Sequence, residues 1–522
     1  MRISTAQYYE TTAANYQRGY NDTLKTSAEA SSLVKVNTAA DDPVGAARLL
    51  QLGQQSAALT QYTSNISSLK SSYTQSETAL TSIQSAMQSA RETALSATNG
   101  TNTDADRKAF AQQLGQIQQT ILGLMNSQDA NGNYLFAGSK TNTLPYTANS
   151  DGTYSYNGDQ SQLNLAIGDN NSVASNVTGW DAFQQSINTA RTQVTMTAPA
   201  VDDGRVTLSN GQISNSATYD AKFSGGQPYT VSFLSSTQIK ITDASGTDVT
   251  TEASQNGVIS NSNGANQTVT FRGVDLGLNL NLKSGDVPDT VIAGHTFTLT
   301  AQPDTFNTSR SAGNPSTAVV TSATTTNQAA YTSTFPAGGA ILKFTSATAY
   351  DLYAAPITAS SRPVSSGTMA GSTATAAGVS LTFGATPPAA GDQFVVQPNN
   401  HQTQNILDTL NQMIGALNTP ADGNAVAQQK LLATLNAGVS NVTSAMDQAG
   451  SALTTIGTRG QVLDDQSTTN QSLVLANTTS QSAIRDSDPA EVMTRLTLQQ
   501  TMLQAAQLAF SKISQLGLFN KI

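Results

Sequence analysis

Apolar residues recur every three to four positions in two long stretches, one near each end of the chain. In the second stretch these steps pass through Leu435, Val439, Val442, Met446, Ala449, Leu453 and Ile456, and the register continues to Leu463 and Val474. In the first stretch the residues that stand seven apart are Leu52, Leu59, Ile66, Tyr73, Leu80 and Met87. This spacing is typical of coiled-coil helices. We therefore expect the two stretches to share one intramolecular seam.

Capping residues mark where these helices begin. Asp42-Pro43 and Asp488-Pro489 place an acceptor before a proline at the first helical position, and Thr419-Pro420-Ala421-Asp422 repeats the arrangement before the second seam. The first long helix is expected to end near Thr98. Thr103 with Asp106 then predicts a capping box that opens a helix whose apolar line is Phe110, Leu114, Ile117, Ile121 and Leu124. We expect this helix to fold back on the first one.

The centre of the chain is rich in Thr, Ser, Gly and Val and shows strand patterns instead. The run from Asn133 to Gly138 follows an Asn-Gly turn and suits a short strand, and Tyr229–Phe233 with Gln238–Thr242 reads as a hairpin closed by a turn at Asp243 to Gly246. Ala293 to Leu299 is echoed by Ala390 to Val396, and the strand around Phe233 by one near Phe344. This repetition predicts two related β units, about residues 205 to 303 and 315 to 398.

The expected fold class is α+β and multidomain, with a terminal coiled-coil helical bundle and a central all-β outer region of two related modules. The N- and C-terminal helices together form the bundle. The expected divisions are 1–42 and 479–522 for an inner helical domain, 43–145 with a β-hairpin and 401–478 for the helical bundle, 146–204 for a β-rich connection, and 205–310 and 311–400 for the β modules.

The composition of the chain argues against several classes of function. Charged residues make up 11% of the chain, the net charge is -9 and the pI is about 4.7, and there is no basic patch of the kind that binds nucleic acid. The chain has no cysteine, which excludes disulfides and thiolate chemistry. The first residues lack the apolar core and cleavage site of a secretory signal peptide. No stretch of the sequence approaches the ~18 consecutive apolar residues of a membrane-spanning helix, so we expect no membrane partner.

Catalytic motifs are missing as well. The two histidines, His295 on an expected strand and His401 before an expected helix, are not paired by spacing and are interpreted as unrelated surface residues. Asp41-Asp42 is expected to cap a helix, and Asp464-Asp465 to mark an exposed break in the last long helix. We expect no enzyme, no catalytic residue, no metal and no cofactor.

Both ends of the chain resemble a known family. The segments Ala39–Ala47, Thr497–Ala505 and Phe510–Ile513 resemble the paired terminal segments of bacterial flagellins. Within that superfamily, the segments Met1–Thr5, Asn133–Thr141 and Leu516–Asn520 resemble the hook-filament junction proteins of the FlgL type. The final Lys521-Ile522 departs from the aromatic and Leu residues usual there.

The resemblance implies an extracellular structural subunit of the flagellum, exported by the type III apparatus without a cleaved signal. Its implied partners are the hook-side junction protein (the first hook-associated protein), flagellin, an export chaperone and further copies of itself in a ring. The apolar line of the last helix would make the assembly and chaperone contacts: Leu496, Leu503, Phe510, Ile513, Leu516, Leu518 and Phe519.

Two other functions stay open. The chain can be a filament-forming flagellin, which would polymerise alone into long tubes. It can also be a secreted protein whose β modules bind carbohydrate on a helical stalk.

Overall fold

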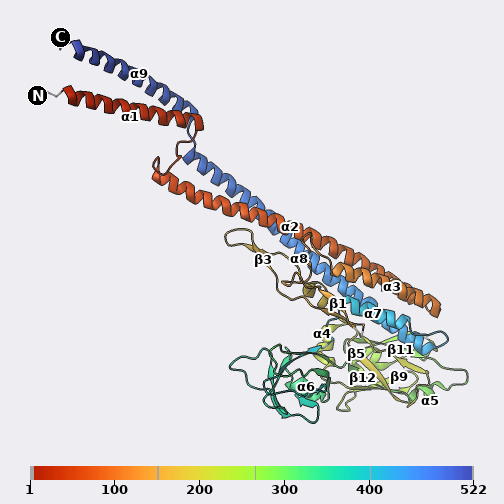
Figure 1. Ribbon diagram of the computed structural model, residues 1–522. Coiled ribbons are helices and arrows are strands. Elements are labelled where there is room, and N and C mark those ends of the chain that lie inside the picture. Colours follow the sequence, from red (N-terminus) through yellow and green to blue (C-terminus); the bar gives the residue numbers. More distant parts are fainter. Residues whose placement is uncertain (1–4, 150–151, 265, 400, 520–522) are drawn as a thin grey trace. The chain divides into compact units, whose positions relative to one another are not determined.

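The computed structural model describes residues 5–149, 152–264, 266–399 and 401–519, with side chains described for these residues except 5, 6, 8, 9 and 513–519. Contacts divide the chain into two compact units. The terminal unit comprises Met1–Thr74, Asn164–Ser175 and Gly457–Ile522, and the central unit comprises Gln75–Leu163 and Asn176–Ile456. Helices with antiparallel sheets confirm the expected α+β class (Figure 1).

The terminal unit is helical. Its elements are α1 (Thr5–Ser32), α9 (Pro489–Phe519), the first part of α2 (Pro43–Ala97), the last part of α8 (Ala425–Arg485), and a hairpin of β3 (Asn164–Ala166) and β4 (Ser172–Ala174). α1 and α9 lie side by side (Figure 1). The predicted starts of α2 and α9 are confirmed, since Asp42 Oδ1 accepts from the N–H of Val44 at 3.1 Å and Asp488 Oδ1 from that of Ala490 at 2.8 Å.

A heptad of buried residues runs along α8. It consists of Leu435, Val442, Ala449, Ile456, Leu463, Asn470 and Asn477. Val439, Met446 and Leu453, which the spacing placed in the seam, are half-buried. The expected continuation to Val474 is wrong, because that side chain is 38% exposed. The two asparagines take the seam positions there, where their amides donate to Ile167 O and Leu52 O at 2.9 and 3.0 Å.

The matching seam of α2 is buried throughout. Its members are Leu52, Leu59, Ile66, Tyr73, Leu80 and Met87, each at most 5% exposed. In the terminal unit, Lys70 on α2 forms an ion pair with Asp464 on α8 at 2.5 Å. In the central unit, Gln84 Nε2 donates to Met446 O at 3.3 Å. The break expected at Asp464-Asp465 is wrong, since α8 is continuous through both residues.

The helical part of the central unit also contains α3 (Asp104–Met125) and α7 (Ile406–Leu417), which pack together. The capping box of Thr103 and Asp106 is confirmed. The helix start expected at Pro420 is wrong. α8 begins at Ala425 with Asn424 as its cap, because Ala421 and Asp422 are held in the connecting loop by Asp104.

The strand expected after Asn133 is also wrong. Only Tyr134 makes an isolated bridge, to Gln128, and the following residues turn. Gly138 has φ +72°, and a Cβ there would meet Asp159, whose carboxylate accepts from Ser139 N at 2.7 Å. The tight turn buries Phe136 completely. A small sheet of β1 (Tyr146–Ala148) and β2 (Tyr154–Tyr156) follows.

The first β module has two sheets around one apolar core. Their strand orders are β5-β12-β8-β9 and β10-β11-β6, with β7 on β11. The elements are β5 (Thr192–Ala198), β6 (Val206–Leu208), β7 (Gln212–Ile213), α4 (Ser216–Thr218), β8 (Tyr229–Ser235), β9 (Gln238–Thr242), β10 (Asn266–Phe271), β11 (Val274–Leu280), α5 (Pro288–Ala293) and β12 (Thr296–Ala301). The predicted hairpin of β8 and β9 is confirmed.

The second β module repeats this plan. Its sheets are β13-β20-β15-β16-β17 and β14-β19-β18 around a separate core. The elements are β13 (Thr305–Arg310), β14 (Val320–Thr325), α6 (Gln328–Thr334), β15 (Ala340–Phe344), β16 (Ala349–Ala354), β17 (Ser365–Thr368), β18 (Thr373–Ala376), β19 (Val379–Phe383) and β20 (Gln393–Asn399). The echoed runs lie in β12 and β20, each the second strand of its sheet.

The two β modules also share a helix cap in which an asparagine packs against a glycine. Asn215 caps α4 and its backbone carbonyl touches Gly273, while Asn327 caps α6 and its carbonyl touches Gly378. Both glycines have positive φ, and their carbonyls accept from the asparagine N–H groups at 3.2 and 3.1 Å. The sequence repeat therefore reflects a structural repeat.

The chain enters and leaves this β region at one place. Asn188 N donates to Gln402 O at 2.9 Å and Gln404 N to Ser186 O at 3.0 Å, with a bridge between Ile187 and Thr403. We call this pair of segments, 186–188 and 402–404, the neck.

Candidate assembly surface

The last helix carries apolar side chains on more than one face. Leu496 and Leu503, predicted as contact residues, are half-buried. Leu503 faces α1, since its Cδ1 lies 3.8 Å from the position that a Cβ on Gly19 would take. Val492 is 2% exposed. This face of α9 is used within the terminal unit.

A second face of α9 remains exposed. Its apolar members are Met493, Leu498, Met502 and Leu508, with exposed fractions of 54%, 55%, 61% and 65%. We call these four residues the outer face of α9. Met493 and Leu498 also line a shallow groove with Thr494, Thr497 and Thr501. Exposed apolar side chains are common where proteins bind one another, and methionine adapts readily to a partner.

Sequence reasoning missed the outer face because it followed the leucines that stand seven apart. Met493, Leu498 and Met502 do not stand a multiple of seven residues from Leu496 and Leu503, so that spacing passes over them. Of the other predicted contacts, Phe510 is 38% exposed. The side chains of Ile513, Leu516, Leu518 and Phe519 lie outside the described residues.

Polar contacts fix the base of the α1–α9 pair. Glu29 on α1 accepts from Arg495 and from Ser487 Oγ, the latter at 2.7 Å. Lys35 N donates to Arg485 O at 2.8 Å, and Ser487 N to Leu33 O at 2.9 Å. The two connectors next to the pair, 33–42 and 486–488, are thus bound to each other.

Asp41 closes the first connector back onto α1. Lys25 Nζ lies 2.8 Å from Asp41 Oδ1, and Thr38 donates to the same carboxylate. The hydrogen bond from Lys25, followed by those from Thr38, lowers the pKa of Asp41 to about 2.

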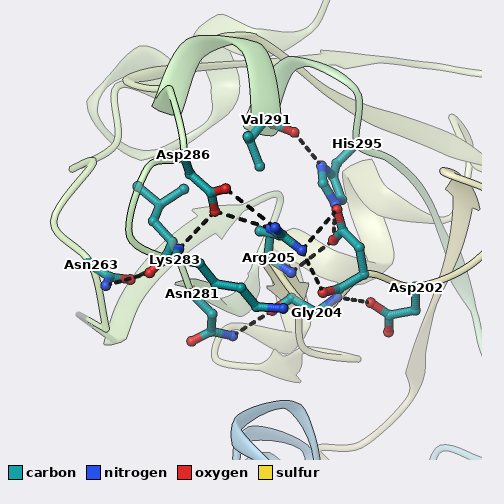
Figure 2. A network of polar contacts seen from close by, with 11 residues as sticks. Asp202, Gly204, Arg205, Asn263, Asn281, Lys283, Asp286, Val291 and His295 are labelled. Carbon is teal, nitrogen blue, oxygen red and sulfur yellow. Dashed lines mark hydrogen bonds and ion pairs between the residues drawn. The ribbon is translucent and has the colours of Figure 1, made fainter.

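Among the described residues, His295 belongs to a network of buried polar contacts. The expectation that His295 is a surface residue is wrong, because it is 2% exposed and precedes β12 (Figure 2). Its Nδ1 lies 2.9 Å from Val291 O and its Nε2 3.0 Å from Asp203 Oδ1. Arg205 in turn binds Asp286 at 3.1 Å. Figure 2 shows these contacts closing the loop that carries Asp202 and Gly204 onto the module.

His401 lies elsewhere, with Nε2 2.9 Å from Pro303 O. Among the described residues, no three His, Cys, Asp or Glu side chains gather where they could hold a metal ion. The helices of the described ranges include none long and apolar enough to cross a membrane.

Comparison with known proteins points to the flagellum. Residues 3–141 match the family described as the bacterial flagellin N-terminal helical region. The chain is 33% identical over 146 residues to flagellar hook-associated protein 3 of Salmonella typhimurium, and 31% identical over 147 residues to that of Escherichia coli. Each match covers 28% of this chain and 46% of the relative. The chain thus spans about half the length of the curated relatives it matches.

A solved structure extends the likeness to the fold. Flagellar hook associated protein-3 from Legionella pneumophila is matched over 83% of this chain and 97% of its own, with a TM-score of 0.50 and 17% identity. Together these similarities confirm the resemblance to bacterial flagellins and to their FlgL-type relatives that the terminal segments indicated.

Proposed function

We propose that this protein is a structural subunit of the bacterial flagellum that joins the hook to the filament. The observation that carries the proposal is the outer face of α9, where four apolar side chains are each more than half exposed. Such a surface is unfavourable in water and becomes stable when another helix covers it. The chain is 33% identical over 146 residues to a flagellar hook-associated protein 3, and this likeness supplies the flagellar context.

The proposal includes specific partners. The terminal helices contact the hook-side junction protein on one side and flagellin on the other, and copies of the chain contact each other in a ring. In such head-to-tail contacts, one surface of a subunit binds a different surface of its neighbour. An export chaperone covers α9 beforehand, and the protein reaches the cell exterior without a cleaved signal. Its role is structural and not catalytic.

Complementation with altered α9 tests the proposal. In a strain that lacks this protein, the double variant Leu498→Asp/Met502→Asp should leave hooks intact but release flagellin as monomers. We expect cell-bound flagellin to fall at least about tenfold, since an unpaired carboxylate in an apolar contact costs more than ~1.4 kcal/mol. Immunoblots of sheared cells and culture medium measure this ratio.

The matched control is Gln500→Asp/Gln504→Asp, which adds the same charges at exposed polar positions of the same helix. It should retain filaments. Thermal unfolding of both purified variants checks that they fold alike. Full filament retention with the Leu498/Met502 variant would contradict the proposal, and seeded growth of the purified protein into long tubes would favour a flagellin instead.

A further inference from the structure

A large cavity with both polar and apolar lining lies in the central unit. Its volume is about 1100 Å³, and it is lined by one face of the sheet β10-β11-β6 and by residues of α7 and α8. Ligand pockets usually enclose roughly 300–1,000 Å³. The cavity is therefore large enough for a ligand of several ring units.

Two buried polar side chains face this cavity without partners. Thr207 on β6 and Asn279 on β11 are opposite each other in the sheet and are 6% and 7% exposed. Both line the cavity. Within the described residues, Thr207 Oγ1 has no hydrogen-bond partner, and the Asn279 amide makes no hydrogen bond either. Since buried polar groups are nearly always hydrogen-bonded, this pair indicates a polar ligand.

The sheet explains why these side chains point outward from the module core. Val206 and Leu278 project into the core, and side chains alternate along a strand. Thr207 and Asn279 consequently project from the opposite face, toward α8. Asn281, two residues further along, already reaches Gln429 on α8, with which it exchanges hydrogen bonds of 2.9 and 3.2 Å.

The rest of the lining is mainly neutral. Gln193, Gln412 and Asn436 present amides that make no hydrogen bond within the described part of the chain. The ionisable residues of the lining are Asp275, which accepts from Thr270 Oγ1 at 2.7 Å, Lys430, and His401, whose Nε2 lies 2.9 Å from Pro303 O. The single carboxylate and single ammonium group balance each other, so the lining favours neither an anion nor a cation.

We infer that this cavity binds a neutral oligosaccharide. Amides and hydroxyls each donate and accept, as sugar hydroxyls do, and Met413, Ala433 and Ala437 give an apolar floor for the ring faces. Thr207 and Asn279 bind the deepest sugar hydroxyls. The site is separate from the assembly surface, because none of its residues lies on α9.

Saturation-transfer NMR and calorimetry on the full chain test this inference. The probes are maltotriose, cellotriose and chitotriose, with sialyllactose as an anionic probe and a neutral Asn-Gln-Gly peptide as an alternative class. At least one neutral trisaccharide should bind with a Kd of about 1 mM or tighter. Thr207→Val should weaken that binding about fivefold, because it removes one hydrogen bond without changing side-chain volume.

The matched control is Thr298→Val, the same change on β12 outside the cavity lining, which should bind like the original chain. If Thr207→Val does not fold, Asn436→Ala at the exposed rim takes its place and should also weaken binding. The inference is overturned if no neutral trisaccharide binds up to ~10 mM, if the peptide or sialyllactose binds more tightly, or if neither variant changes the affinity.

Discussion

Arg107 shows how one residue can hold a chain reversal. It is 2% exposed near the start of α3, and its guanidinium binds Asp104, the carbonyl of Asn102 and Asp422 in the loop before α8. Burial alone would lower the pKa of Arg107, but the hydrogen bonds to the two carboxylates raise it above its ordinary value. The charge is therefore retained inside the protein.

Replacing Arg107 should destabilise the central unit. Arg107→Met keeps most of the apolar stem but removes the guanidinium that binds Asp104, Asp422 and the Asn102 carbonyl, and we expect the free energy of unfolding to fall by about 2 kcal/mol. Lys108→Met, the same change at the exposed neighbouring position, should stay within ~0.5 kcal/mol. Urea unfolding measures both. Equal values for the two variants would show that the network around Arg107 contributes nothing.

Among the elements, α1 and the connector 33–42 are joined by a titratable contact between Lys25 and Asp41. The folded pKa of Asp41, about 2, lies below its ordinary value of 3.8, so the stabilisation is fully present above that value and is lost as pH falls toward 2. Carbon NMR of the protein with labelled Asp should give a titration midpoint of pH about 2 for the Asp41 carboxylate. In Lys25→Gln this midpoint should move toward 3.8. Arg18→Gln, also exposed on α1, should not shift it. An unchanged midpoint in Lys25→Gln would exclude the ion pair as the main cause.

At the same scale, apolar spacing predicted the elements better than it predicted which residues they bury. The α2 seam is buried as spaced, but on α8 the heptad passes to Asn470 and Asn477, and on α3 the buried line includes Arg107 and Gln118. A pattern of apolar residues cannot reveal these positions, because the polar side chains are buried by specific hydrogen bonds. Similarly, the outer face of α9 contacts no other helix within the described part of the chain that would impose a period on it.

For the whole molecule, proteolysis should separate the terminal helices from the rest. Trypsin is expected to release residues 1–35 and 486–522 early by cutting after Lys35 and Arg485, because α1 and α9 are largely exposed. Glu29→Gln, which weakens the contacts to Arg495 and Ser487, should speed this loss about fivefold. Glu10→Gln, at an exposed position of α1, should not.

Mass mapping of the digest over time measures the loss. Persistent protection of residues 490–522 in the free protein would contradict the expectation, and would mean that α9 is already stable without a partner.

The neck places the start and the end of the β region next to each other in the fold. Because its two segments are hydrogen-bonded to each other, the chain enters and leaves the β region through one closed junction. An insert whose ends arrive next to one another can be joined to the helices there, with loss of the contact between Asn281 and Gln429. The position of the neck is thus compatible with lengthening, duplication or loss of the β region, and this chain carries a doubled module between residues 192 and 399.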